Sequence, residues 1–182
     1  MAARFDPQKD YPAFFAAAEK VIAAYEDVAF IACGSGVEAA NPAISPLIAG
    51  GEIARHVHLL GRRADMERFY PALDIYVSTA IGEGFANVVG EAMCCAVPCI
   101  VTDVGDSRAI VGDSGIAIPP ADPAAMARAI VALLDRPAHN RQAMGAHARE
   151  RMRDFSIATV ARQFEAMWRR VAQNCGGYTP PA

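Results

Sequence analysis

The sequence lacks several features that would point to whole classes of protein. It has no basic excess, since 17 Lys and Arg stand against 20 Asp and Glu, a formal net charge of −3. Proteins that hold nucleic acid through its backbone usually carry such an excess, so nucleic acid is not an expected partner. An anionic ligand remains compatible with this balance if a few local groups bind it.

Long apolar runs and paired cysteines are also missing. Runs such as Val28–Cys33 and Val97–Val101 are far shorter than the roughly 20 residues of a membrane-spanning helix. The first residues lack the basic head and apolar stretch of a secretory signal. Five cysteines without a Cys-x-x-Cys pair favour thiols packed in a cytoplasmic protein over a disulfide scaffold. No His-Glu-x-x-His run or Asp-x-Asp pair offers a metal site, so no metal is expected.

What is present fits one folded α/β domain. The chain has 182 residues, of which 53% are hydrophobic, enough for a sizeable core. Short apolar runs alternate with amphipathic segments, a pattern typical of strands buried on both faces of a parallel sheet. It predicts a Rossmann-like sheet with helices on both faces. The expected strands are Val28–Ala32, Val57–Leu60, Ile75–Ser78, Cys99–Val101 and Gly115–Ile118.

The segments between these runs predict helices, and the two ends of the chain differ from the rest. Residues 1–3 resemble the end of a further strand. Ser156 is placed to cap a helix with a wide apolar stripe, which needs cover from the chain's own sheet or from a partner. Residues 176–182 have the composition of a flexible tail. The expected helices are about Asp10–Tyr25, Asp65–Leu73, Ala86–Cys95 and Pro123–Leu134, the last capped by Asp122.

Three loops carry residues suited to an anionic ligand. Ligands of open α/β sheets bind beyond the carboxyl ends of the strands, where these loops are predicted. The first holds Arg4 and Lys9, and the second runs from Leu60 to Arg63. The third, Gly82–Phe85, opens into a helix whose first amides favour phosphate.

The simplest interpretation is that these charged residues have no role in binding and lie on a solvated surface. Glu91 argues against it, because it lies in an otherwise apolar helix, where a carboxylate needs a partner. A second interpretation comes from residues 34–39, Gly-Ser-Gly-Val-Glu-Ala, which fit the loose dinucleotide fingerprint of a dehydrogenase-type domain. Asn41-Pro42 follows at once, however, where that fingerprint requires a continuing helix. The next strand also ends in Gly61 rather than in an acidic residue.

An ordered set of motifs resembles the C-terminal half of the family-four, or "group 1", glycosyltransferases of the GT-B fold. The most specific is Glu83-Gly-Phe-Ala-Asn-Val-Val-Gly-Glu91-Ala-Met, which fits that family's E-x7-E signature. The resemblance runs from Arg4 to about Val171. Ala96 stands where the family usually has glycine, which we interpret as a small-for-small packing exchange. The supporting motifs are Arg4 with Lys9, Leu60-Gly61, Ala72-Leu73-Asp74, Pro98, Thr102-Asp103-Val104-Gly105, Gly112–Gly115 and Asp122-Pro123.

The resemblance implies a role for each matching residue in binding a nucleoside-diphosphate sugar. Arg4 and Lys9 would bind the diphosphate and neutralise the leaving group, with Glu83 at the sugar hydroxyls, and these three would be catalytic. Glu91 would accept hydrogen bonds from the ribose hydroxyls. The remaining donor contacts would be Arg62 beside the nucleobase and the backbone amides of Gly84, Phe85, Asn87 and Val88.

The resemblance also implies what the rest of the enzyme does. Residues 1–155 would form the donor-binding domain with a truncated first strand, and residues 156–175 the terminal helix. The transfer to a hydroxyl acceptor would retain the anomeric configuration and need no cofactor or metal. The acceptor would bind to an N-terminal domain that is missing here, and any peripheral contact with the inner membrane face would belong to the full enzyme. A non-catalytic nucleotide-binding module or a split-enzyme subunit is the alternative.

Overall fold

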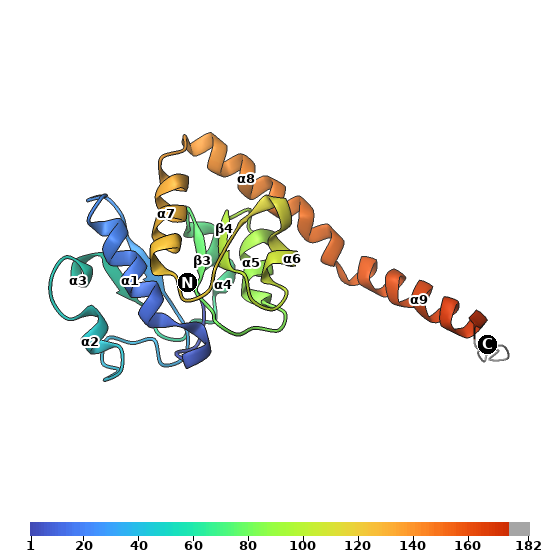
Figure 1. Ribbon diagram of the computed structural model, residues 1–182, viewed down its shortest axis with the longest axis horizontal. Coiled ribbons are helices and arrows are strands. Elements are labelled where there is room, and N and C mark those ends of the chain that lie inside the picture. The colour runs from blue at the N-terminus through green and yellow to red at the C-terminus, as the bar shows by residue number, and fades with distance from the viewer. Residues whose placement is uncertain (175–182) are drawn as a thin grey trace.

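The computed structural model describes residues 1–174 and shows a Rossmann-like α/β domain from which one long helix projects (Figure 1). Five short strands are present in this range, and every paired neighbour is parallel. β1 pairs with β2, and a second sheet has the order β3-β4-β5. The five predicted strands are confirmed, with ends that differ by one or two residues. Their bounds are Phe30–Ala32, Val57–Leu59, Tyr76–Ser78, Cys99–Thr102 and Ile116–Ile118.

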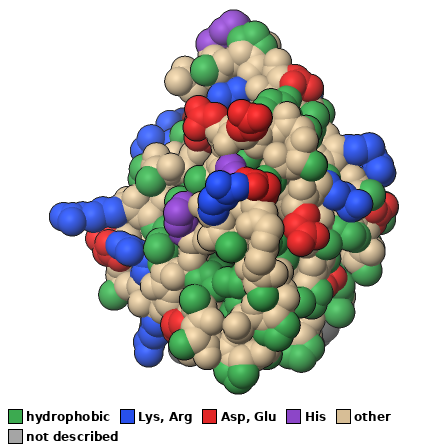
Figure 2. All heavy atoms as spheres, turned by 90° about the vertical axis from the view of Figure 1, so that its left-hand side faces the viewer, with side chains coloured by type: hydrophobic (Ala, Val, Ile, Leu, Met, Phe, Trp, Pro, Cys, Tyr) green, Lys and Arg blue, Asp and Glu red, His purple; other side chains and the backbone are tan. Residues whose placement is uncertain are grey.

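Helices cover both faces of the strands, as predicted. α1 (Tyr11–Ile22) and α7 (Pro123–Leu134) pack together on one face and share one apolar cluster. α5 (Asn87–Cys94), α6 (Ser107–Val111) and α8 (Ala138–Arg151) lie on the other side with a second cluster (Figure 1). On the surface that carries α1, α2 (Ser45–Ile48) and α3 (Ile53–His56), acidic and basic side chains are interspersed (Figure 2), in keeping with the small net charge.

Local signals explain where several helices begin. The Asp122 carboxylate accepts a hydrogen bond from the Ala125 amide at 2.8 Å, so the predicted cap of α7 is confirmed. The expected helix at residues 65–73 is split into α4 (Met66–Phe69) and a 3-10 turn, Tyr70–Ala72, because Pro71 cannot donate to a continuing helix. The remaining short elements are η1 Pro7–Lys9, α2 Ser45–Ile48, α3 Ile53–His56, η3 Gly112–Ser114 and η4 Met152–Phe155.

Ala96 is more than a packing exchange, which corrects the expectation from the sequence. Its φ is +59°, in the left-handed region that favours glycine. It follows the last turn of α5 in a Schellman arrangement, with the Ala96 amide bonded to Met93 O and the Val97 amide to Ala92 O. The family's usual glycine therefore relieves the backbone here, and alanine carries the strain.

The C-terminal helix, α9 (Ile157–Asn174), extends away from the domain (Figure 1). Its predicted cap is confirmed, since Ser156 Oγ accepts from the Thr159 amide at 3.2 Å. Ile157 is 90% and Trp168 65% exposed, so the apolar stripe does not fold back on the chain's own sheet, the first of the two expected arrangements. The predicted tail at 176–182 lies outside the described residues.

Candidate functional site

The carboxyl ends of the strands carry an open cleft of about 720 Å³. It is lined from one side by residues 2–4 with Gln8 and Lys9, and from the other by the loop after β3 and the start of α5. Five of the residues predicted from the sequence meet here: Arg4, Lys9, Glu83, Gly84 and Val88. Segments more than 70 residues apart in the chain therefore build one site, as the loop argument predicted.

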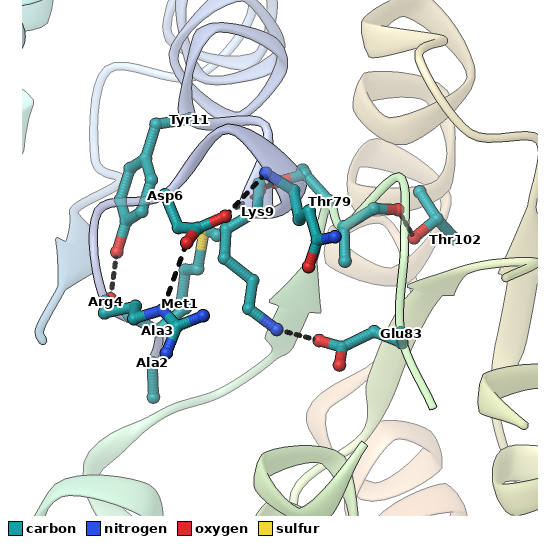
Figure 3. Close-up of polar contacts among 12 residues, drawn as sticks. Met1, Ala2, Ala3, Arg4, Asp6, Lys9, Tyr11, Thr79, Glu83 and Thr102 are labelled. Carbon is teal, nitrogen blue, oxygen red and sulfur yellow. Dashed lines mark hydrogen bonds and ion pairs between the residues drawn. The ribbon is translucent and has the colours of Figure 1, made fainter. Parts of the chain in front are cut away.

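The first wall of the cleft is held by backbone pairing and one short turn. Residues 1–3 run beside β1, with the Ala3 amide bonded to Cys33 O at 2.9 Å, so that Arg4 emerges where the strands end. Asp6 then caps η1 by accepting from the Gln8 amide at 2.9 Å. That hydrogen bond, with a further contribution from Arg4, lowers the pKa of the Asp6 carboxyl. η1 delivers Lys9 to the cleft (Figure 3).

Two hydrogen bonds tie this wall to the end of β3. The buried hydroxyl of Thr79 donates to Lys9 O at 2.8 Å, and the Ile81 amide donates to Gln8 O at 2.8 Å. The Thr102 hydroxyl in turn donates to Ala80 O at 2.5 Å (Figure 3). Sequence reasoning missed these threonines as site residues because each acts through a contact between distant segments.

Lys9 and Glu83 form an ion pair across the cleft (Figure 3). Their side chains are only 19% and 12% exposed, so the pair is partly shielded from water. Arg4 instead bonds Asp6 at 3.2 Å and is 67% exposed, which leaves its guanidinium open to a ligand. An anion that displaces Glu83 from Lys9 would meet two cations at once.

Gly105 fixes the position of the Glu83 loop. Its φ is +51°, and a Cβ there would lie 2.3 Å from Glu83 O and 2.6 Å from Gly84 O. The Asp106 amide donates to Gly84 O at 3.1 Å, so the loops after β3 and β4 are in direct contact. Only glycine permits this approach. The sequence carried this signal in the motif Thr102–Gly105.

Glu91 lies in a second, adjacent cavity of about 550 Å³. Phe85 and Asn87 line the same cavity, and none of these three lines the first cleft. Val88 does line the first cleft. Positions three apart on a helix are neighbours, so Val88 and Glu91 lie side by side on α5, between the two cavities. The Asn87 amide, expected to bind phosphate, already donates to Phe85 O at 3.0 Å.

Glu91 is exposed, so its carboxylate does not require a protein partner as the sequence argument expected, but Tyr70 bonds it. The Tyr70 hydroxyl donates to Glu91 Oε2 at 2.7 Å. Burial, and then this hydrogen bond to an anion, raise the pKa of Tyr70 well above its usual value, so it stays a donor. The sequence did not single out Tyr70, because the pairing joins α5 to a turn 21 residues earlier.

The predicted loop after β2 does not reach either cavity. Arg62 is exposed and lines neither of them. The glycine loop after β1 packs against the backbone of Ala3, since a Cβ at Gly34 would lie 1.9 Å from Ala3 O. The next helix begins only at Ser45, so the dinucleotide fingerprint lacks the helix that it requires.

Within residues 1–174 no three His, Cys, Asp or Glu side chains are grouped so as to hold a metal ion. No helix in the same range is long and apolar enough to cross a membrane.

Comparison with known proteins identifies relatives over most of the chain. The family model described as "Glycosyl transferases group 1" matches residues 1–136. A D-inositol 3-phosphate glycosyltransferase of Kineococcus radiotolerans is 33% identical over 122 residues, 62% of this chain and 28% of the relative. A phosphatidyl-myo-inositol mannosyltransferase of Mycobacterium leprae is 29% identical over 175 residues, 93% of this chain and 45% of the relative.

Solved structures agree with this fold. Sucrose-phosphate synthase from Thermosynechococcus elongatus superposes with a TM-score of 0.77 at 26% identity, covering 93% of this chain and 44% of that one. Anabaena HepE in complex with UDP gives a TM-score of 0.79 at 20% identity, covering 93% and 48%. The chain thus spans less than half the length of each of these four proteins.

Proposed function

Because the chain belongs to the group 1 glycosyl transferases, we propose that it is the donor-binding half of a retaining enzyme. In this proposal the cleft binds a nucleoside-diphosphate sugar, and the sugar passes to a hydroxyl acceptor. The observation that carries it is the convergence of Arg4, Lys9 and Glu83 on one cleft. Crystals of Anabaena HepE, which has a similar fold, hold UDP or UDP-glucose, which supports the choice of ligand.

The two cations are assigned to the diphosphate. As the glycosidic bond breaks, negative charge develops on the leaving diphosphate. Nearby cations therefore stabilise the transition state more than the ground state. Lys9 leaves Glu83 to bind a phosphate oxygen, while Arg4 bonds the other phosphate. This assignment lets side chains neutralise the leaving group, so the proposal includes no metal and no cofactor.

Glu83 and the loop around it are assigned to the sugar and the phosphates. Once Lys9 has turned to phosphate, the Glu83 carboxylate is free to accept from sugar hydroxyls. The backbone amides of Gly84 and Phe85 extend the same contact. The first turn of α5 faces phosphate with the Val88 amide and, after a shift away from Phe85 O, the Asn87 amide.

Glu91 is assigned to the ribose, and Arg62 to the nucleobase. A carboxylate matches a vicinal diol because its two oxygens can accept from both hydroxyls. Tyr70 occupies one lone pair of Glu91 Oε2 and holds the carboxylate in place. Arg62 follows β2 and lines neither cavity here, so this assignment requires its exposed side chain and loop to move toward the bound base.

A separate N-terminal domain would complete the enzyme. The relatives' greater length supports this, as does the exposed apolar stripe of α9, which we propose docks on that domain. The same stripe favours the second candidate function, a non-catalytic nucleotide-binding module or a subunit of a split enzyme. Turnover is measured with and without a separately produced amino-terminal half: activity only on mixing supports a split enzyme, and no activity on mixing supports a non-catalytic module.

Calorimetric titration with UDP, GDP and ADP tests donor binding. At least one is expected to bind below millimolar concentration, and the absence of heat with all three would overturn the proposal. Glu91→Ala should weaken the nucleoside diphosphate more than pyrophosphate, whereas equal losses would remove the ribose assignment. A dehydrogenase-type domain would instead bind NAD(H), and nucleotide sugars would not displace it.

A further inference from the structure

Asp10, which directly follows Lys9, has an unusual backbone conformation. Its φ is +47° and its ψ is +57°, in the left-handed region that L residues rarely adopt, asparagine and aspartate more readily than the others. Residues in such conformations are concentrated at functional sites, where the surrounding structure holds them in place. The contacts of Asp10 show what its conformation achieves for Lys9.

Asp10 both ends η1 and begins α1. Its amide donates to Pro7 O at 3.3 Å, which closes η1. Its carboxylate accepts from the Ala13 amide at 3.1 Å, which caps α1. In a continuous helix the Ala13 amide would instead donate to Lys9 O, four residues earlier. The left-handed turn at Asp10 therefore keeps Lys9 out of α1 and leaves Lys9 O free for another donor.

The Thr79 hydroxyl, buried directly after β3, is that donor. It lies 2.8 Å from Lys9 O and 3.1 Å from Asp10 O, so it contacts both carbonyls of the turn. It joins the turn to the strand whose following loop carries Glu83. The Lys9 side chain starts from this anchored backbone and reaches Glu83 across the cleft (Figure 3).

The helix on the other side of the turn is fixed in the core. Tyr11 and Phe14, in the first turn of α1, are buried. The Tyr11 hydroxyl donates to Ala3 O at 2.5 Å (Figure 3), so the start of α1 also holds the residue before Arg4. The conformation of Asp10 therefore decides how the backbone of Lys9 is oriented relative to a rigid part of the domain.

We propose that Asp10 is a positioning residue for Lys9. Its left-handed backbone directs the Lys9 side chain into the cleft, and its carboxylate secures that direction by capping α1. The negative charge of Asp10 has no part in this role. The inference deepens the proposed function and rests on it for nucleotide binding, whereas the Lys9–Glu83 ion pair can be followed without a nucleotide.

Two neutral substitutions of Asp10 separate its backbone conformation from its charge. Asp10→Asn and Asp10→Thr both keep a side chain that caps a helix, and both remove the carboxylate. Asparagine tolerates the left-handed conformation, whereas threonine is β-branched and strongly disfavours it. That conformation costs an ordinary L residue about 5- to 30-fold in population, so only Asp10→Thr should displace Lys9. Asp122→Thr is the matched control, because Asp122 caps α7 in the same way with a φ of −119°.

The two lysines of the chain allow a measurement by NMR without a ligand. With lysine labelled at Cε and Nζ, only Lys9 and Lys20 contribute signals, and Glu83→Gln identifies the Lys9 signal as the one that moves. In Asp10→Thr the Lys9 signal should move toward its position in Glu83→Gln. In Asp10→Asn and Asp122→Thr it should stay in place. A Lys9 signal that stays in place in Asp10→Thr, or moves as far in Asp10→Asn, would overturn the proposal whether or not the chain binds a nucleotide.

Calorimetry with UDP, GDP and ADP extends the test to the cleft. The nucleotide that the natural chain binds most tightly should bind Asp10→Thr at least ~fivefold more weakly, and Asp10→Asn at least as tightly as the natural chain. Equal affinity of Asp10→Thr and the natural chain would overturn the positioning role. A natural chain that binds none of the three would overturn donor binding instead, and the NMR measurement would still decide the role of Asp10.

Asp10→Ala is the second variant, for the case that Asp10→Thr does not fold. It removes the cap and lacks the tolerance of asparagine for the left-handed turn, so the Lys9 signal should move in the same direction. An unmoved Lys9 signal in Asp10→Ala would then overturn the proposal.

Discussion

Removal of the Lys9 ammonium is the most informative perturbation of the donor cleft. A hydrogen bond to a charged group contributes about 1.5–3 kcal/mol, so its loss should weaken UDP binding about 10- to 150-fold. Lys9→Ala should reach the upper part of that range, because it leaves the Glu83 carboxylate unpaired beside the diphosphate. Lys20→Ala is the matched control: Lys20 is the other lysine of the chain and is exposed on α1.

Glu83→Gln completes a double-mutant cycle measured by calorimetry. Because UDP lacks the transferred sugar that Glu83 is proposed to bind, this variant should bind UDP several-fold more tightly than the natural chain, with Lys9 released from its partner. In the double variant the repulsion is gone, so the loss caused by Lys9→Ala should shrink by a measurable coupling. The reasoning is refuted if Lys9→Ala binds UDP as tightly as the natural chain does. It is also refuted if Lys20→Ala loses as much affinity for UDP as Lys9→Ala.

Four substitutions, one of them a control, test the framework of the domain. Gly105→Ala should lower the free energy of unfolding by about 3 kcal/mol. Left-handed strain contributes ~1–2 kcal/mol and overlap of the new Cβ with the Glu83 and Gly84 oxygens ~1–3 kcal/mol, so Tm should fall by ~6–12 °C. Gly84→Ala enters open space, so a comparable fall there would contradict this account. Ala96→Gly should raise Tm by ~2 °C by relieving the left-handed backbone, and a lower Tm would refute the strain. Tyr70→Phe should destabilise by about 1 kcal/mol in urea titration, because the exposed Glu91 can turn to water; no change would mean that the hydrogen bond is not formed in solution.

The sequence predicted what depends on local pattern. Continuous apolar runs located five strands, and Asp122 and Ser156 marked helix starts because capping is decided within three residues. α8 (Ala138–Arg151) was not placed, since its side chains are mostly polar and only Gly145 and Ala148 are buried. Gly145 packs against Ala96 O, a contact that no local pattern reveals.

The candidate site was likewise predictable from the sequence only in part. Arg4, Lys9 and Glu83 were predicted because loops at the carboxyl ends of neighbouring strands must meet. Tyr70 and Thr79 were missed because each contributes through a hydrogen bond between segments far apart in the chain. Glu91 is separated from the first cleft because it faces another side of α5 than Val88. The sequence alone does not give these directions, because they depend on how α5 packs around Tyr70.

A crystal structure of the chain with a bound nucleoside-diphosphate sugar tests the central claim most directly. The account predicts a diphosphate with oxygens about 3 Å from the side-chain nitrogens of both Arg4 and Lys9, and with Glu83 turned from Lys9 to the sugar. A ligand bound away from this cleft, or a diphosphate in it with the Lys9–Glu83 ion pair intact, would contradict the account.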